Sequence, residues 1–405
     1  MSLRQLSIQW KITLLAGLCL LGVVTLLVGL SLYRMDHTAD MVEASSSQML
    51  NESAQARIEA QGEAQALAIS RQFMDAYQYG NGFARQVLFL REQSEKRFLD
   101  AFDLREDLTR QVKAALQANP DLLGLSLVFE ANALDGKDSL FDHQKELGSN
   151  DKGRFALYWS QPTPGKLSSM ALPESDMADT STGPSGQANN AWFTCPRTTR
   201  KPCIIEPYFY EIDGQNILLT SIVFPLIVDG KVIASLSVDI NLNSLQAITV
   251  QASQKLYDGQ TRVGIISSAA ILAGFSADAS KLAQRLDQVD ASDGAELIRI
   301  MATGNQAQSI RSQQRLKILT PFQPIPGSKP WGVLLDVPEA VLVGPAQALQ
   351  AELDERNKAG ALTELAWGSL AAIIGLLLVW LMARSVTRPI LGVANMLEDI
   401  ASGEG

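Results

Sequence analysis

The two longest apolar stretches of the chain lie near its ends, at residues 12–33 and 365–383, and neither contains a charged side chain. A helix of 22 residues, the length of the first stretch, extends about 33 Å at 1.5 Å per residue, which is enough to cross a bilayer. A cleavable signal peptide explains the first stretch less well, because the apolar run is too long and no A-x-A-like cleavage site follows it. We therefore predict two transmembrane helices at these positions.

Basic residues flank both apolar stretches. Arg4 and Lys11 precede the first, and Arg384 and Arg388 follow the second. Since positively charged flanks stay in the cytoplasm, we expect both ends of the chain there and residues 34–364 outside, which in a bacterium is the periplasm. The pattern predicts a multi-pass protein of the bacterial inner membrane.

The first part of the outer region, residues 34–118, has a helical pattern. It contains no proline, and small or apolar side chains recur before residue 78 at Met41, Ser45, Met49, Ala56 and Ala60. Gly80-Asn81-Gly82 predicts an interruption, followed by a second helical stretch at residues 84–118. A helix this long is not covered by its own small domain, so a partner helix is needed and we expect a homodimer.

From residue 122 the pattern changes to short apolar strands separated by turn signals. Asp213-Gly214 and Asp229-Gly230 each predict a tight hairpin. Residues 161–190 are rich in Pro, Gly, Ser, Thr, Asp and Asn, and they predict a long loop that is either functional or disordered. The predicted strands are 122–129, 153–159, 204–210, 216–227 and 231–239, and helical periodicity returns at 241–251.

A second, weaker set of strands and helices follows, with strands at 262–267, 307–322 and 330–336, helical patterns near 278–302, and a helix from Pro338 into the second span. The predicted fold class is α+β, with two tandem modules on a long stalk helix between two transmembrane helices. The predicted segments are a cytoplasmic N-terminus (1–11), stalk helices (34–118), a membrane-distal module (about 119–252), a membrane-proximal module (about 253–340) and a C-terminal helical segment (384–405).

Composition excludes several classes of function. The chain has 34 Lys and Arg against 43 Asp and Glu, which disfavours a nucleic-acid partner. Two histidines and three cysteines are too few for a metal centre of the Cys/His type, and no phosphate-binding glycine loop is present. His37 lies beside the first span and leaves only His143 for a catalytic triad. We therefore expect no enzyme activity and no cofactor.

Cys195 and Cys203 close a nine-residue loop in the region expected outside the membrane. In an oxidising compartment such a pair predicts a disulfide, which stabilises the fold by about 2–3 kcal/mol through loop closure. Two free thiols are the alternative.

Aromatic and acidic residues gather between residues 155 and 240. Side chains alternate along a strand, so Tyr208 and Tyr210 share one face, and Ser237 shares a face with Asp239. A carboxylate among aromatic rings suits a cationic guest, since cation–π attraction contributes about 0.5–2 kcal/mol per ring. The alternative is that the rings form core and that Asp239 caps the next helix. The aromatic residues are Phe155, Tyr158, Trp159, Trp192, Phe193, Tyr208, Phe209 and Tyr210.

The C-terminal segment points to a receptor family. Val386, Ile390, Val393, Leu397 and Ile400 form a heptad seam directly after the second span. With Arg388-Pro389-Ile390 and Ile400-Ala401-Ser402-Gly403, the chain resembles a methyl-accepting chemotaxis receptor that stops early in its HAMP linker. The outer region resembles a double-Cache (dCache) sensor, which implies two PAS-like modules.

The resemblance also implies a set of ligand-binding residues. Glu206-Pro207-Tyr208 and Ser237-Val238-Asp239-Ile240 match the pocket segments of the membrane-distal Cache module. Where amino-acid-sensing members have Arg-x-Trp-Tyr, this chain has Asn190-Ala191-Trp192-Phe193, so the arginine that would hold a carboxylate is missing. The departure implies a small amine without a carboxylate, as in the polyamine- and histamine-sensing chemoreceptors of pseudomonads. The implied set is Tyr158, Asn190, Trp192, Phe193, Tyr208, Tyr210, Ser237 and Asp239.

The implied partners are a small amine ligand, the inner membrane, a second copy of the chain within a trimer of dimers in arrays, and a cytoplasmic histidine kinase with its coupling protein. Three alternatives stay open. The sensor could feed a histidine kinase or cyclase domain, the ligand could be an amino acid or a quaternary amine such as choline, or the chain could be a structural envelope protein without a small ligand.

Overall fold

The structure is a computed structural model that describes residues 8–304 and 306–401. It divides into two units, one formed by the chain up to Ser53 and from Val343 onward, and the other by Ala54–Leu342. The ends of the predicted segments 1–11 and 384–405, including Gly403-Glu404-Gly405, lie outside the described residues.

The first unit is built from parts of two long helices, α1 (Ile8–Arg97) and α8 (Glu339–Ala401). Each contains a segment that is long and apolar enough to cross a membrane, Trp10–Arg34 in α1 and Glu339–Ile390 in α8. Large apolar side chains on these segments are exposed, for example Leu15 at 73% and Trp367 at 67%. Such surfaces suit lipid better than water, so both segments are candidate membrane helices, and they include the predicted spans.

Glycines allow the two helices of this unit to approach closely. A Cβ atom at Gly17 would lie 2.8 Å from Leu376 Cδ2, and one at Gly375 would lie 2.6 Å from Leu20 Cδ2. Close contact over small residues is typical of membrane helix pairs.

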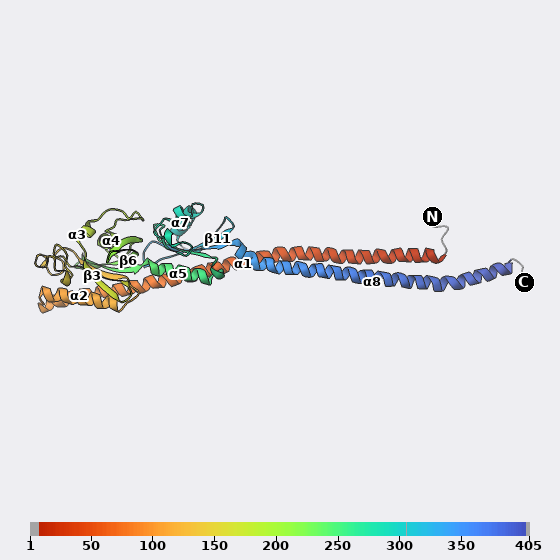
Figure 1. The fold of residues 1–405 in the computed structure, drawn as a ribbon, viewed down its shortest axis with the longest axis horizontal. Helices are drawn as coiled ribbons and strands as arrows, with labels where there is room; N and C mark the ends of the chain where they lie inside the picture. Colours follow the sequence, from red (N-terminus) through yellow and green to blue (C-terminus); the bar gives the residue numbers. More distant parts are fainter. Residues whose placement is uncertain (1–7, 305, 402–405) are drawn as a thin grey trace. The chain divides into compact units, whose positions relative to one another are not determined.

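The larger sheet of the second unit is antiparallel, with strand order β3-β2-β1-β7-β6-β4 and with β5 paired to the first half of β6. Helix α2 and the adjoining part of α1 cover one face, and α3 and α4 cover the other (Figure 1). The strands are β1 (Gly124–Phe129), β2 (Ala156–Thr163), β3 (Lys166–Ala171), β4 (Cys203–Ile204), β5 (Tyr208–Ile212), β6 (Gln215–Val228) and β7 (Lys231–Asn241), and the helices are α2 (Ala101–Gln117), α3 (Glu174–Ala178), α4 (Ala191–Thr199) and the 3-10 turns η2 (Asp138–Leu140) and η3 (Lys145–Leu147).

The second sheet is antiparallel, with strand order β10-β11-β12-β8-β9. Trp331 is fully buried in this sheet and meets Phe73 of α1 edge-on at 5.2 Å, so the core continues from one sheet to the other along α1. The strands are β8 (Arg262–Ile266), β9 (Leu272–Phe275), β10 (Gln308–Ser312), β11 (Arg315–Phe322) and β12 (Trp331–Pro338), and the helices are α5 (Leu242–Lys255), α6 (Leu286–Val289), α7 (Gly294–Thr303) and the 3-10 turns η4 (Tyr257–Gly259) and η5 (Ala279–Lys281).

Both predicted hairpins are confirmed. Asp213-Gly214 joins β5 to β6 and Asp229-Gly230 joins β6 to β7, and all four residues have positive φ, between 46° and 75°. This conformation matches the right-handed twist of the paired strands. The strand predicted at 307–322 is also a hairpin, β10 and β11, whose turn at Gln313 and Gln314 carries no glycine signal.

The predicted interruption at Gly80-Asn81-Gly82 is wrong, since α1 continues through it. A Cβ atom at Gly80 would lie 2.3 Å from Phe224 Cε2 and 2.7 Å from Val238 Cγ2. Gly80 is therefore a close contact between helix and sheet, and the helix ends only after Arg97.

The predicted loop at residues 161–190 is also wrong in part, because the segment contains β3 and α3. Leu172 N donates to Ala156 O at 2.7 Å, and the Leu172 and Met177 side chains are buried. These contacts hold the segment over the face of the larger sheet that α3 and α4 cover, which we call its outer face.

Candidate ligand-binding site

The candidate site lies on the outer face of the larger sheet, beneath the segment that carries α3 and α4. Strand register brings its polar side chains together: Ser126 of β1 lies opposite Ser237 of β7 on one side and Tyr158 of β2 on the other. Gly124 lies opposite Asp239, and a Cβ atom there would lie 2.6 Å from Tyr158 Oη. The absence of a side chain at Gly124 thus lets the Tyr158 ring reach across the sheet.

Asp239 is the acid of this site and is 5% exposed. Its Oδ1 accepts hydrogen bonds from Ser237 Oγ at 2.5 Å and Ser221 Oγ at 2.7 Å. Within the described residues, no Lys, Arg or His forms an ion pair with this carboxylate. Burial raises the pKa of Asp239 above its ordinary value, and the hydroxyl groups of Ser237, Ser221 and Tyr158 offset part of that increase.

Tyrosines surround the carboxylate. Ser221 donates to Asp239, so Tyr208 Oη donates in turn to Ser221 Oγ at 2.9 Å. Tyr158 and Tyr210 meet edge-to-face at 6.1 Å. Burial, followed by the charge of Asp239, raises the pKa of Tyr158 and Tyr208 well above the ordinary value, so both rings stay neutral and present their π-faces and hydroxyl groups.

A second acid touches the edge of the site. Tyr210 Oη donates to Asp176 Oδ2 at 2.9 Å, which ties the β5 strand to α3. Burial, and then the neighbouring Asp176 charge, raises the pKa of Tyr210.

The cavity between these residues is narrow, with a volume of about 20 Å³. That is room for about one water molecule, so a larger guest must displace part of the wall. We call this cavity the Asp239 pocket, and its lining is Ser126, Tyr158, Leu172, Trp192, Tyr208, Tyr210, Ser237 and Asp239.

Six of the eight residues expected at the site line the Asp239 pocket, and Asn190 and Phe193 do not. Asn190 is buried at the start of α4, where its Nδ2 donates to Met177 O at 2.9 Å and ties α4 to α3. Phe193 is buried behind Trp192, and the Arg197 guanidinium lies 4.7 Å from its ring. Both support the wall without facing the cavity.

Sequence patterns did not indicate Ser126 and Leu172 in the lining, or Ser221 next to it. Ser126 is a hydroxyl in an otherwise apolar strand, which is a usable signal once its pairing with Ser237 is known. Leu172 lies in the segment interpreted as a loop.

Cys195 and Cys203 form a disulfide that joins α4 to β4. Because Trp192 is on α4, the bond holds the helix that carries one wall of the Asp239 pocket. The prediction of a disulfide is confirmed.

The part of the chain that forms the larger sheet is similar to a known class of sensor. Residues 108–247, which include the Asp239 pocket, match the family described as the methyl-accepting chemotaxis protein-like first PDC sensor domain. The class that the match indicates is a PDC (Cache-type) sensor module.

The chain is similar over its whole length to a named receptor, a methyl-accepting chemotaxis protein. It is 60% identical over 405 residues to the methyl-accepting chemotaxis protein TlpQ of Pseudomonas aeruginosa, covering 100% of this chain and 57% of that protein. The chain therefore spans a little over half the length of this relative. Both comparisons agree with the resemblance to a chemoreceptor with a Cache-type sensor.

Solved structures show the same fold at low sequence identity. The periplasmic sensory domain of the Campylobacter jejuni chemoreceptor Tlp1 has a TM-score of 0.54 at 12% identity and covers 70% of this chain and 94% of its own. Methyl-accepting chemotaxis protein X has a TM-score of 0.51 at 21% identity, covering 70% and 98%. The extracellular domain of mmHK1S-Z3, assigned as a histidine kinase, has a TM-score of 0.56 at 19% identity, covering 71% and 96%. The predicted α+β sensor fold is confirmed.

Proposed function

We propose that this chain is the sensing part of a transmembrane chemoreceptor that binds a small organic amine without a carboxylate in the Asp239 pocket. One observation carries the proposal: a buried carboxylate has no cationic partner among the described residues, and the groups that hydrogen-bond to it are neutral hydroxyls. A buried charge in that state is costly until a cation compensates it. The ammonium group of the ligand is that cation.

The chemistry of the pocket favours such a ligand. A charge-assisted hydrogen bond from an ammonium group to Asp239 contributes about 1.5–3 kcal/mol, and each well-placed ring of Trp192, Tyr158 or Tyr208 adds about 0.5–2 kcal/mol. No Lys, Arg or His lines the Asp239 pocket. A ligand carboxylate would therefore enter an acidic, partly apolar cavity without a counter-charge.

Hydrogen bonds connect the wall of the pocket to the second sheet. The Glu206 amide donates to Gln187 Oε1 at 3.0 Å, and Ser268 Oγ of the β8–β9 turn donates to a carboxylate oxygen of Glu206. Gln187 belongs to the segment that covers the pocket. A ligand that displaces this segment therefore also moves Glu206 and, through it, the second sheet. The change then passes to α8, the helix that follows β12.

We further propose that the signal continues through the second membrane helix and a HAMP linker to a cytoplasmic histidine kinase, in a homodimer located in the inner membrane. The heptad seam from Val386 to Ile400 supports a paired helix after the membrane. A different output domain, such as a kinase in the same chain, would use the same sensor fold, as mmHK1S-Z3 illustrates.

Calorimetric titration of the full chain in lipid nanodiscs tests the ligand class. The ligands are used as matched pairs that differ by one α-carboxylate, histamine with L-histidine and 1,4-diaminobutane with L-ornithine, with choline alongside. We expect the amines to bind and the matched amino acids to bind at least about tenfold more weakly, because the carboxylate lacks a partner. Equal affinities within both pairs would contradict the proposal.

Asp239→Asn tests the anchor. Loss of the charge-assisted hydrogen bond should weaken amine binding about 10- to 100-fold. Asp229→Asn is the matched control, since Asp229 is an exposed aspartate on the β6–β7 turn and asparagine tolerates its positive φ. Unchanged affinity in Asp239→Asn would exclude Asp239 as the amine anchor.

A further inference from the structure

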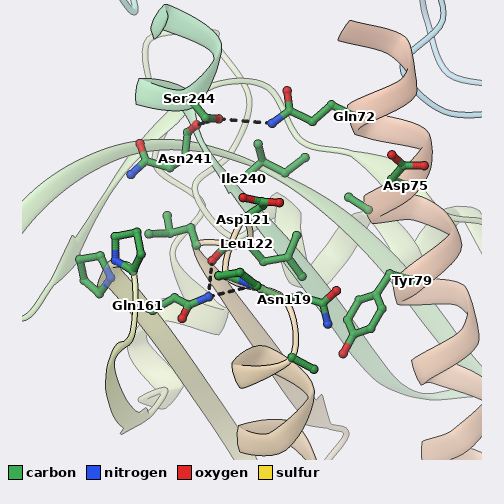
Figure 2. Close-up of a pocket in the computed structure, with 16 residues that line it drawn as sticks. Gln72, Asp75, Tyr79, Asn119, Asp121, Leu122, Gln161, Ile240, Asn241 and Ser244 are labelled. Carbon is green, nitrogen blue, oxygen red and sulfur yellow. Dashed lines mark hydrogen bonds between the residues drawn. The ribbon is translucent and has the colours of Figure 1, made fainter. Parts of the chain in front are cut away.

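The opposite face of the larger sheet carries a second, much larger cavity of about 600 Å³ (Figure 2). It lies where four segments meet: one face of α1 around Asp75, the α2–β1 turn around Asp121, the end of β2 at Gln161, and the start of α5 at Ser244. Its volume is in the range of small-molecule sites. The two cavities share no lining residue.

The lining of this cavity is negative. Asp75 and Asp121 are exposed and line it, and neither carboxylate forms a hydrogen bond or an ion pair within the described residues. Its lining contains no Lys, Arg or His. Helix α2 ends at Gln117 beside the cavity with no basic residue in its last turn, so the negative end of its dipole is not compensated there. The opposing N-terminus of α5 is already capped by the Asn241 side chain, which accepts from Asn243 N at 2.9 Å.

Two amide side chains in the wall, those of Gln161 and Gln72, have oxygens that accept no hydrogen bond from the described residues. Gln161 is only 4% exposed, and its Nε2 donates to Asn119 O at 2.9 Å and Leu122 O at 3.0 Å (Figure 2). Its Oε1 accepts no hydrogen bond from any described residue. Gln72 Oε1 is buried without a donor among those residues. A buried acceptor without a donor costs free energy. A ligand that brings N–H groups would satisfy Gln72 Oε1 and would find a further acceptor in Gln161 Oε1.

We propose that this cavity is a second binding site, for an organic cation with one or two ammonium groups. The carboxylates attract the charge, the amide oxygens of Gln161 and Gln72 accept N–H donors, and the Ile240 and Leu122 side chains contact the carbon chain. A metal ion fits less well, because no group of three or more Asp, Glu, His or Cys in the described part of the chain could hold one.

Neighbouring residues of the same backbone segments line the second site and the Asp239 pocket. Leu123, which lines the cavity, donates its amide to the Asp239 carbonyl at 2.9 Å, and Ile240 directly follows Asp239 on β7. A cation in the cavity therefore binds one residue away from the acid that faces the other side of the sheet. Occupancy of either site is expected to alter affinity at the other, and the effect must be reciprocal.

The test is a set of calorimetric titrations of the full chain in nanodiscs, with 1,4-diaminobutane as the probe. The variants are Asp239→Asn, Asp75→Asn/Asp121→Asn, and all three changes together. Asp103→Asn is the control, because Asp103 is an exposed acid on α2 that does not line the cavity. In the Asp239→Asn background we expect residual binding, which Asp75→Asn/Asp121→Asn weakens about tenfold and which falls further as salt increases.

Two results would overturn the second site: an Asp75→Asn/Asp121→Asn isotherm that matches its parent, or an equal loss in Asp103→Asn, which would indicate a general charge effect. Displacement of the probe by CaCl2 but not by NaCl at matched ionic strength would overturn the choice of an organic cation. An Asp239→Asn isotherm identical to the wild type would contradict the proposed function and leave the second site standing.

Discussion

Replacement of Gly80 by alanine tests the packing of the stalk helix against the sensor sheet. A Cβ atom at this position would lie 2.3 Å from Phe224 Cε2, 2.7 Å from Val238 Cγ2 and 2.8 Å from Phe224 Cζ. All three distances are far below van der Waals contact. The side chains are buried, so the strain cannot be relieved by rotation into solvent.

The magnitude follows from two opposing terms. Overpacking of a buried contact costs about 1–3 kcal/mol, whereas alanine in place of glycine within a helix gains about 0.5–1 kcal/mol. The net effect of Gly80→Ala is therefore a loss of up to about 2.5 kcal/mol, with a central value of about 1 kcal/mol. Gly82→Ala is the matched control: it lies in the same helix, nothing lies within 4 Å of the position that its Cβ would occupy, and we expect a gain of about 0.5–1 kcal/mol.

Thermal unfolding of the full chain in nanodiscs, followed by tryptophan fluorescence, separates the two variants. At about 2–4 °C per kcal/mol, the shift typical of domains of about 150–250 residues, Gly80→Ala should melt a few degrees below the wild type and Gly82→Ala slightly above it. Because Val238 precedes Asp239 on β7, Gly80→Ala should also weaken amine binding. Equal stabilisation by both alanines would refute the close contact of α1 with β6 and β7.

Four further outcomes are expected. Amine affinity should fall as pH is lowered through the raised pKa of Asp239, because the protonated carboxyl must lose its proton to bind an ammonium group; a flat titration profile down to about pH 4 would contradict this. Because the folded-state pKa of Asp239 is raised, the protonated carboxyl favours the ligand-free fold, and this stability is lost as pH rises through that pKa. At neutral pH Asp239→Asn should therefore raise the melting temperature of the ligand-free protein, and an unchanged melting temperature would contradict the cost of the buried charge. Trp192→Ala should weaken amine binding about 3- to 30-fold through loss of cation–π attraction, with unchanged calorimetric affinity as the refuting result. Glu206→Ala should leave amine affinity within about threefold of the wild type yet reduce ligand-induced change at the second sheet, measured by hydrogen exchange at the β8–β9 turn, and full retention of that change would exclude Glu206 from transmission.

The predicted fold agrees with the structure where local signals decide it. The Asp-Gly turns and the alternation of Ser237, Val238 and Asp239 depend on neighbouring residues alone, so the hairpins and the two faces of β7 were predictable. Gly80 was not, because the same residue type signals a helix break or a close contact, and only Phe224, far along the chain, distinguishes the two.

The candidate site was predictable to a similar extent. The alternation of strands placed Tyr208 with Tyr210 and Ser237 with Asp239, and all four line the Asp239 pocket. Asn190 instead turns to Met177, because the covering segment forms its own helices. The cavity around Asp75 was not predictable at all. It is formed by four segments that are distant in sequence, and its two acids, Asp75 and Asp121, look like ordinary surface residues.

The small volume of the Asp239 pocket has a consequence for how sensitivity is set. If the ligand enters only when the Leu172–Met177 cover is displaced, the measured dissociation constant equals the intrinsic one divided by the fraction of molecules that are open. Substitutions in the cover that never touch the ligand would then shift the detection threshold over orders of magnitude while leaving chemical selectivity intact. The ligand concentration to which such a sensor responds can therefore change during evolution while the residues that contact the ligand stay the same.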